Sequence, residues 1–284
     1  MVWMNIDGVV VGDRSERGKL RFTGEQNAWF LHQIMTQSFE DIAPGEARDT
    51  AMITAHGRMV GFMETIATDD AILAHFESSL LESLPDAIGR YVFATRVDIQ
   101  DVTSDMGLLL VAGPGWESIV DSEVSGAIVH PTASLGAPAA YLWVAKESAA
   151  DLLAKLEGAG ASRVGEAELE EMRITNGVPR WGFEMDFKTI PQEVGVDHNA
   201  VHYDKGCYVG QEAMAKIHLR GKVNRRLARV EGAELRRGDD LMLDGTRVGV
   251  VTSASNGLAL AVVKHTVGEG AELETSGGAA RVVS

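Results

Sequence analysis

The stretch Asp204–Glu212 reads DKGCYVGQE and contains Cys207, the one cysteine of the 284-residue chain. Gly206 and Gly210 flank this cysteine, and glycine lets a backbone turn sharply and approach another group closely. Lys205 stands two residues before the thiol, and a neighbouring cation favours the reactive thiolate form. A buried cysteine packed beneath a turn is the alternative, because cysteine is among the most buried residue types. The polar residues crowded around it favour a functional loop.

The composition restricts the class of protein. A chain of 284 residues exceeds what one hydrophobic core usually serves, so we expect two or three subdomains. The net charge of −15 disfavours direct nucleic-acid binding and anionic membranes. A single cysteine cannot form an internal disulfide, the opening MVWMNIDG does not resemble a signal peptide, and no apolar run has membrane-spanning length. We therefore expect a cytoplasmic protein without membrane partners.

Hydrophobic patterns predict two successive units of mixed strands and helices, followed by an all-β part. The first unit has expected strands at 19–22, 50–55, 59–68, 71–76 and 91–99, a helix after a capping box at Thr23, and a helix at 78–88. The second has expected strands at 107–112 and 140–145 and helices at 116–124, 148–156 and 166–175. A long irregular segment, 184–203, leads to the cysteine motif.

The residues after position 215 change to short alternating runs. The dipeptides Asp244-Gly245 and Asn256-Gly257 are typical of tight hairpin turns. We therefore predict an α+β fold of two α+β subdomains plus a small C-terminal β-barrel. The approximate boundaries are 1–104, 105–215 and 216–284, and the subdomains can interleave.

The motif KGCYVGQE at 205–212 resembles the signature of the YgfZ proteins, which are folate-binding relatives of the glycine-cleavage T-protein. Three further segments are similar to that family: LRFTGEQNAWFLHQIMTQ at 20–37, MRITNGVPRWGFEMD at 172–186 followed by Pro191, and HLRGKVNRRLARVEG at 218–232. The resemblance covers about Lys19 to Lys264. It implies a ring of two α+β domains and one β-barrel around a tetrahydrofolate site.

The resemblance also implies a function. Bacterial members of the YgfZ family support the assembly or repair of iron–sulfur proteins, including a tRNA-modifying enzyme. The implied cofactor is tetrahydrofolate or a derivative, and the implied partners are a reduced folate and iron–sulfur client proteins. We expect the folate in a cleft between the α+β part and the barrel.

Two departures from the T-protein pattern bear on the alternative function, a folate-dependent one-carbon transferase of the aminomethyltransferase type. Gly61 and Phe62 stand where the T-protein has a pair of aspartates, so no carboxylate is expected there. The acidic Gly-Glu-Asp-Gly loop that grips the pterin in the T-protein has no counterpart between Leu135 and Lys146. The equipment for aminomethyl transfer is therefore expected to be absent.

The motif and one arginine supply the candidate site residues. The catalytic candidate is Cys207, and the folate-binding candidates are Lys205, Gly206, Tyr208, Gln211, Glu212 and Arg173. Arg173 matches an arginine of the T-protein family, and arginine binds carboxylates such as the folate tail in a forked manner. Alternatively, Arg173 lies on the surface and pairs with Glu170. Tyr208 can stack on the ligand or fill the core, and Gln211 and Glu212 are expected to fix the loop by bonding its backbone.

Two further clusters are weaker candidates. His198 and His202 are four residues apart, a spacing that binds metal on a helix, but the flanking residues disfavour a helix and we predict no metal. A basic cluster in this acidic chain consists of Arg220, Lys222, Arg225, Arg226 and Arg229. It is interpreted either as a solvated barrel edge or as a docking patch for an anionic group.

Overall fold

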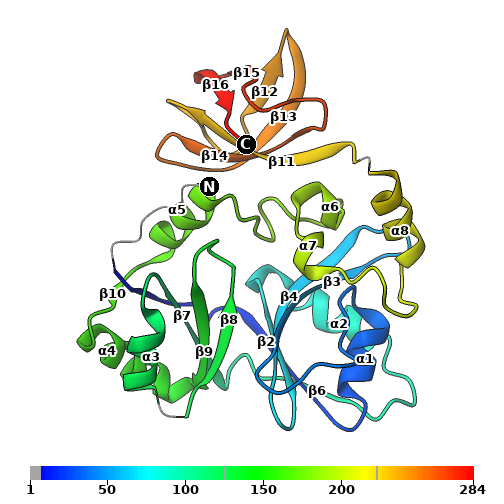
Figure 1. The fold of residues 1–284 in the computed structure, drawn as a ribbon, viewed down its shortest axis with the longest axis vertical. Helices are drawn as coiled ribbons and strands as arrows, with labels where there is room; N and C mark the ends of the chain where they lie inside the picture. Colours follow the sequence, from blue (N-terminus) through cyan, green and yellow to red (C-terminus); the bar gives the residue numbers. More distant parts are fainter. Residues whose placement is uncertain (1–7, 125, 222) are drawn as a thin grey trace.

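The structure is a computed structural model that describes residues 8–124, 126–221 and 223–284. Two α+β units lie side by side, and a β-barrel lies above them (Figure 1). Helices α5 (Glu166–Asn176), α6 (Pro191–Val194) and α7 (Asp197–Ala200) occupy the middle between the three parts. The predicted α+β architecture with a C-terminal barrel is confirmed.

The first unit is built on a sheet of strand order β3-β4-β5-β2-β6, antiparallel throughout. Its strands are β2 (Gly18–Thr23), β3 (Ala47–Ile53), β4 (Met59–Ala67), β5 (Ile72–Phe76) and β6 (Asp98–Asp101). The β3–β4 hairpin turns at Gly57, whose φ of 78° favours glycine. Its helical segments are α1 (Asn27–Ile34), a 3-10 turn (Ser78–Leu80) and α2 (Ser83–Gly89).

The second unit has a sheet of order β10-β1-β7-β9-β8, in which the β1–β10 pair is parallel. Its strands are β1 (Val10–Asp13), β7 (Met106–Ala112), β8 (Ile128–Thr132), β9 (Ala139–Ala145) and β10 (Ser162–Arg163). Helices α3 (Trp116–Glu123) and α4 (Ala149–Gly158) belong to this unit, and a 3-10 turn (Lys146–Ser148) precedes α4. Helix α4 buries Ala149, Leu152, Leu153 and Leu156, the spacing of one helix face.

The barrel closes in the order β11-β14-β13-β12-β15-β16. Its strands are β11 (Arg225–Gly232), β12 (Asp240–Leu243), β13 (Thr246–Ser255), β14 (Leu258–Lys264), β15 (Glu272–Thr275) and β16 (Gly278–Val282). Asp244 and Asn256 have φ of 49° and 48°, and the glycine after each is also positive. Positive φ at both central residues is the geometry of tight hairpin turns, so both predicted turns are confirmed.

The two α+β units share one core. Ile66 and Leu73 of the first sheet pack in a single cluster with Leu108, Leu110 and Trp143 of the second. A second core fills the first unit and includes the linker residues Trp181, Met185, Val194, Val201 and Tyr208. The linker that carries the cysteine motif therefore packs on the first unit, although it follows the second unit in sequence.

Three local predictions were wrong. The segment 91–99 forms a strand only from Asp98, and the residues before it are turns and bends. Thr23 does not cap α1, because Gly24 turns with a φ of 97° and the helix begins at Asn27. Strand β8 was not expected. Strand β1 joins the sheet of the second unit, so the units interleave and the boundary near residue 104 does not separate the two sheets.

Candidate functional site

Lys205 ties the cysteine motif to the end of α1. Its Nζ donates hydrogen bonds to the backbone carbonyls of His32, Met35 (2.7 Å) and Gln37 (2.9 Å). These carbonyls lie at and just beyond the C-terminus of α1, where helix acceptors have no partner within the helix. Burial lowers the pKa of Lys205 to about 7. Only the ammonium form has three N–H donors for three carbonyls, so this contact favours the charged lysine.

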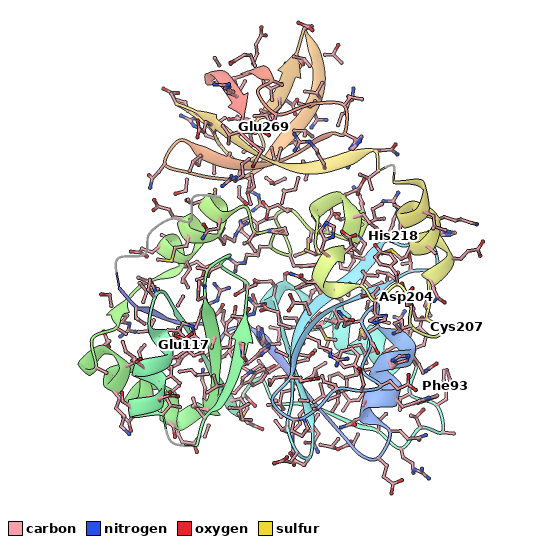
Figure 2. The ribbon with its side chains drawn as sticks, in the orientation of Figure 1. Phe93, Glu117, Asp204, Cys207, His218 and Glu269 are labelled. Carbon is pink, nitrogen blue, oxygen red and sulfur yellow. The ribbon has the colours of Figure 1, made fainter. Side chains whose placement is uncertain are left out.

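Cys207 and Tyr208 face opposite environments. The Cys207 thiol is exposed, whereas Tyr208 is 8% exposed and packs in the core of the first unit. The ammonium of Lys205 lies 4.8 Å from the centre of the Tyr208 ring, a cation–π distance. In Figure 2, Cys207 lies at the outer edge of the molecule, near Asp204. The packed-cysteine interpretation is therefore wrong, and the core interpretation of Tyr208 fits the structure.

The rest of the motif fixes the loop and starts a helix. Gly210 has a φ of 84°, and a Cβ there would lie 2.4 Å from the carbonyl oxygen of Thr54, so this turn requires glycine. Helix α8 (Gln211–Arg220) follows, and the Gln211 side-chain amide donates to the Lys205 carbonyl at 3.1 Å. Glu212 instead points to solvent and pairs with Lys216, so its predicted bond to the loop backbone was wrong.

Arg173 is buried at 3% exposure, so the surface alternative was wrong, although the pairing with Glu170 is present. Its guanidinium also donates to the Val178 carbonyl (2.9 Å), to Glu184 (2.8 Å) and to the Ser253 hydroxyl (2.6 Å). With two further bonds to Glu170, all five N–H donors are used within the protein. A ligand carboxylate would have to displace one of these partners.

A cavity of about 360 Å³ lies where the two α+β units meet α5 and the linker. Its lining comes from the β1–β2 loop, strands β3, β4, β7 and β9, helix α5 and the segment 177–199. No lining residue belongs to Asp204–Glu212 or to the barrel. The central cavity is therefore not the predicted cleft between the α+β part and the barrel. A separate hollow of about 440 Å³ does adjoin the barrel, lined in part by Arg225 and Lys264.

Three arginines of the central cavity converge on one carboxylate. Glu77 forms ion pairs with Arg17 at 2.9 Å and with Arg180 at 2.8 Å, and Arg14 lies 3.5 Å away. Although burial opposes ionisation, these three cations lower the pKa of Glu77 to about 2. Each arginine also has a buried Nε without a hydrogen-bond partner among the described residues. These Nε atoms are fully buried, and that of Arg14 lies 3.2 Å from Glu16, so they are not free donors for a ligand.

Two neighbouring strands of the cavity wall, β3 and β4, each contribute a carboxyl group. Asp49 of β3 and Glu64 of β4 are direct cross-strand partners, and both line the cavity with Phe62. Glu64 accepts hydrogen bonds from Arg17 (3.3 Å) and from the Thr132 hydroxyl. Phe62 occupies the position where an aspartate was expected. Gly61 and Phe62 supply no carboxylate, but Glu64 lies two residues further along the same face of β4 and brings one to this wall.

A buried imidazole lies behind Glu64. His75 of β5 is fully buried, and its Nδ1 is 4.0 Å from Glu64 Oε1. Its ring packs against His130, Tyr141 and Trp143. Burial and the nearby Arg17 hold the pKa of His75 well below its usual value, so the ring is neutral. His75 was not among the candidate residues, although it lies beside Glu64 of the cavity wall.

The two weaker clusters do not form the expected arrangements. His198 lies on α7 and His202 follows it, and both line an open surface groove with Asp41 and Arg48. Within residues 8–124, 126–221 and 223–284, no group of three or more His, Cys, Asp or Glu side chains forms a metal site. Lys222 and the Arg220 side chain lie outside the described residues.

The other arginines of the basic cluster differ in their contacts. Arg226 and Arg229 are bonded to backbone carbonyls, including Val267 and Thr175. Arg225 is exposed at the barrel edge. These residues therefore do not form one continuous free patch.

Sequence reasoning missed the residues that line the cavity most closely: Arg14, Arg17, Asp49, Glu64, Glu77 and Arg180. One signal was available. Glu64 and His75 interrupt the otherwise apolar strands MVGFMETIA and ILAHF, and ionisable residues are rarely fully buried unless paired. The convergence of loops on Glu77 had no such signal, because it depends on how the sheets pack.

No family model matches the chain. The Arabidopsis thaliana protein named "Putative transferase, chloroplastic" is 28% identical over 272 residues, which are 88% of this chain and 63% of that protein. This chain thus spans less than two thirds of that relative. An aminomethyltransferase of Rubrobacter xylanophilus is 26% identical and covers 86% of this chain and 71% of its own length.

A third relative carries the name "tRNA-modifying protein YgfZ" and comes from Colwellia psychrerythraea. It is 22% identical over 223 residues, which cover 75% of this chain and 68% of that protein. In the part of the chain that the structure describes, no helix has the length and apolar character to cross a membrane.

Among solved structures, the glycine cleavage system aminomethyltransferase T from Bartonella henselae superposes with a TM-score of 0.87 at 17% identity. The match covers 97% of this chain and 85% of that structure. The sequence relatives thus include aminomethyltransferases and a YgfZ protein, and the chain has the fold of aminomethyltransferase T.

Proposed function

We propose that this chain binds a reduced folate in its central cavity and supports the assembly or repair of iron–sulfur proteins, including a tRNA-modifying enzyme. The observation that carries the proposal is the central cavity itself, set in the aminomethyltransferase T fold and lined by three arginines. The KGCYVGQE signature supports the iron–sulfur role by its resemblance to YgfZ proteins.

The cavity fits the head of a folate. Its volume of about 360 Å³ lies within the range of small-molecule pockets. Phe62 and Trp181 offer aromatic surface for a pterin, and the positive charges of Arg14, Arg17 and Arg180 on the cavity wall can attract its oxygen atoms. A reduced folate bound here would supply a carrier for one-carbon units. The chain's own residues would hold and orient it and keep water away from the buried wall.

The position of Cys207 supports a role in partner contact. The thiol is exposed on the outer side of the first unit, and no residue of its loop lines the cavity. A client protein can therefore reach the cysteine while folate occupies the cavity. Gly61 and Phe62, in place of two aspartates, argue against the aminomethyltransferase reaction as the main function.

Calorimetry with tetrahydrofolate and its 5-formyl derivative tests the folate proposal. We expect saturable binding, weakened at least tenfold by Arg180→Lys, because lysine keeps the charge but loses the forked guanidinium donors. Arg247→Lys is the matched control, since Arg247 is exposed on β13 and pairs with Asp240. Absence of binding by any reduced folate at millimolar concentration would refute the proposal.

The iron–sulfur proposal has a separate test in cells that lack their own YgfZ protein. Expression of this chain should restore the activity of an iron–sulfur enzyme that modifies tRNA. Restoration by Arg180→Lys should be partial and should improve when folate is abundant. A chain that binds folate but restores nothing would leave the cavity assignment intact and remove the iron–sulfur role.

A further inference from the structure

Asp49 and Glu64 are neighbouring carboxyl groups on the wall of the central cavity. They face each other across the β3–β4 ladder, where cross-strand side chains lie close together. Glu64 is bonded to Arg17 and Thr132, whereas Asp49 has no hydrogen-bond or ion-pair partner among the residues that the structure describes. Asp49 is thus a carboxyl group without a described partner beside a carboxyl group that is held by two hydrogen bonds. Such an arrangement on a cavity wall is unusual, because buried polar groups normally have partners.

The buried imidazole of His75 gives an independent sign that this wall is functional. Neither ring nitrogen has a hydrogen-bond partner within the described chain, although the residue is fully buried. Nδ1 is aimed at Glu64, 4.0 Å from its Oε1. Buried polar groups without partners are rare in native proteins, and a ligand, a water or a mobile proton commonly accounts for them.

Charge favours a single proton on the pair. The charged and titratable groups that face it are Arg17, Arg14, Glu77 and His75 from within, and Asp41, Arg48, His198 and His202 from the outer groove. Only Arg17 contacts the pair directly, and two adjacent carboxylates do not both ionise readily beside one cation. Burial and next the Glu64 carboxylate raise the pKa of Asp49 to about 7, and burial raises that of Glu64.

Asp49 also connects the cavity to solvent. Together with Ala133 and Asn199 it lines both the central cavity and the open groove that contains His198 and His202. A proton on Asp49 can therefore exchange with water on one side and with a ligand on the other. Glu64 lacks this access because its side chain is only 5% exposed.

We propose that Asp49 and Glu64 form the general acid–base pair of the central cavity and exchange a proton with a basic nitrogen of the ligand bound there. This inference rests on the proposed folate site. In the forward step the O–H bond of protonated Asp49 breaks, its electron pair stays on oxygen, and an N–H bond forms on the basic nitrogen of the ligand. The ligand gains one positive charge and the pair gains one negative charge, so charge and atoms balance.

The protonation of the pair can be tested without any ligand. The protein is labelled with ¹³C at its carboxyl groups, and its NMR spectrum is followed as the pH is changed. We expect one aspartate resonance to titrate near pH 7, to disappear in Asp49→Asn, and to move down by at least one pH unit in Glu64→Gln. Asp69→Asn, at an exposed turn between β4 and β5, is the matched control and should change nothing. An Asp49 resonance that titrates near pH 4 in the wild type would overturn the proposal.

The second arm uses two folates that differ at one nitrogen. In 5-methyltetrahydrofolate N5 is a basic amine, whereas in 5-formyltetrahydrofolate it belongs to an amide. Calorimetry in buffers of different ionisation enthalpy should show greater proton uptake for the methyl form in the wild type. Asp49→Asn should lose this difference while its affinity for the formyl form stays within about threefold.

The outcomes separate the two proposals. If neither folate binds the wild type, the proposed function fails, and the NMR arm still decides whether the pair shares a proton. If both folates bind with equal proton uptake in wild type and Asp49→Asn, the folate site stands and the acid–base pair is refuted.

Discussion

Lys205 and Cys207 are separated by one residue, yet their surroundings differ completely. The Lys205 ammonium is buried against three carbonyls at the end of α1, whereas the Cys207 thiol is exposed on the surface of the same unit. The lysine therefore holds the loop in place and has no donor left for a ligand. The exposed Cys207 side chain does not contribute to core packing, so packing does not explain why a cysteine stands at this position. Chemistry at this loop thus depends on the thiol and on what approaches it from outside.

Replacement of Cys207 should separate function from stability. Because the thiol is exposed, Cys207→Ala and Cys207→Ser should change the unfolding free energy by no more than about 0.5 kcal/mol. Folate affinity should stay unchanged, since no residue of the loop lines the cavity. Both variants should nonetheless fail to restore the iron–sulfur enzyme in cells, whereas Ser118→Ala on α3 should succeed.

The alkylation of this thiol gives a complementary readout. If folate binds in the central cavity, saturating folate should leave the rate of iodoacetamide reaction unchanged. Strong protection by folate would contradict this and return Cys207 to the ligand site. Full complementation by Cys207→Ala would remove its functional role altogether.

Among the elements, α5 makes the connection between the α+β units and the barrel. Arg173 on α5 contacts Ser253 on β13, and Ser253 donates in turn to the buried Glu184 of the linker. Arg229 on β11 donates to the carbonyl of Thr175 near the end of the same helix. The helix therefore serves as a junction held by buried charges, and its arginine belongs to that junction.

Arg173→Met should destabilise the protein by about 3–5 kcal/mol, because it leaves the buried Glu184 without its cation and leaves Glu170 with Arg180 alone. Denaturant titration measures the change, with Arg163→Met at the exposed strand β10 as the control. The double variant Arg173→Met/Glu184→Met should recover part of the loss, since it removes both partners of a buried pair. An unchanged unfolding free energy, combined with weakened folate binding, would instead identify Arg173 as a ligand residue.

The elements themselves were largely predictable, and the contacts between them were not. Local patterns identified the β3–β4 hairpin and the barrel turns at Asp244 and Asn256, because these depend on neighbouring residues. The strand predicted at 91–99 failed because a run of apolar and aromatic residues does not reveal whether a neighbouring strand pairs with it. The same limit applies to Asp49 and Glu64, which are fifteen positions apart and meet only across the hairpin.

At the scale of the whole molecule, Glu77 joins segments that no local pattern relates. It follows β5 in the first unit, and it binds Arg14 and Arg17 of the loop that connects the two sheets and Arg180 of the linker. The three cations repel one another, and the negative charge of the ionised Glu77 carboxylate offsets that repulsion. The state of Glu77 therefore affects how both units and the linker close around the cavity.

Acid should loosen this junction in a defined pH window. The pKa of Glu77 is about 2 in the folded protein and near its usual value of about 4.5 in the unfolded chain, so the unfolded chain binds more protons between these values. The stabilisation is complete above about pH 4.5 and is lost as the pH falls toward 2. Glu77→Gln should cost about 3–5 kcal/mol at pH 7, where it removes the one anion that all three arginines share, and much less at pH 3.

Guanidinium denaturation at pH 7 and pH 3 measures this difference, and Glu82→Gln, an exposed carboxylate in the same region, is the control. Folate affinity at pH 7 should fall in Glu77→Gln but not in Glu82→Gln, because the three arginines then lose the anchor that sets their positions. An equal stability loss at both pH values would show that Glu77 acts through its shape and hydrogen bonds. The closure of the three segments around the cavity would then have to be explained by packing, without a charge-dependent contribution from this carboxylate.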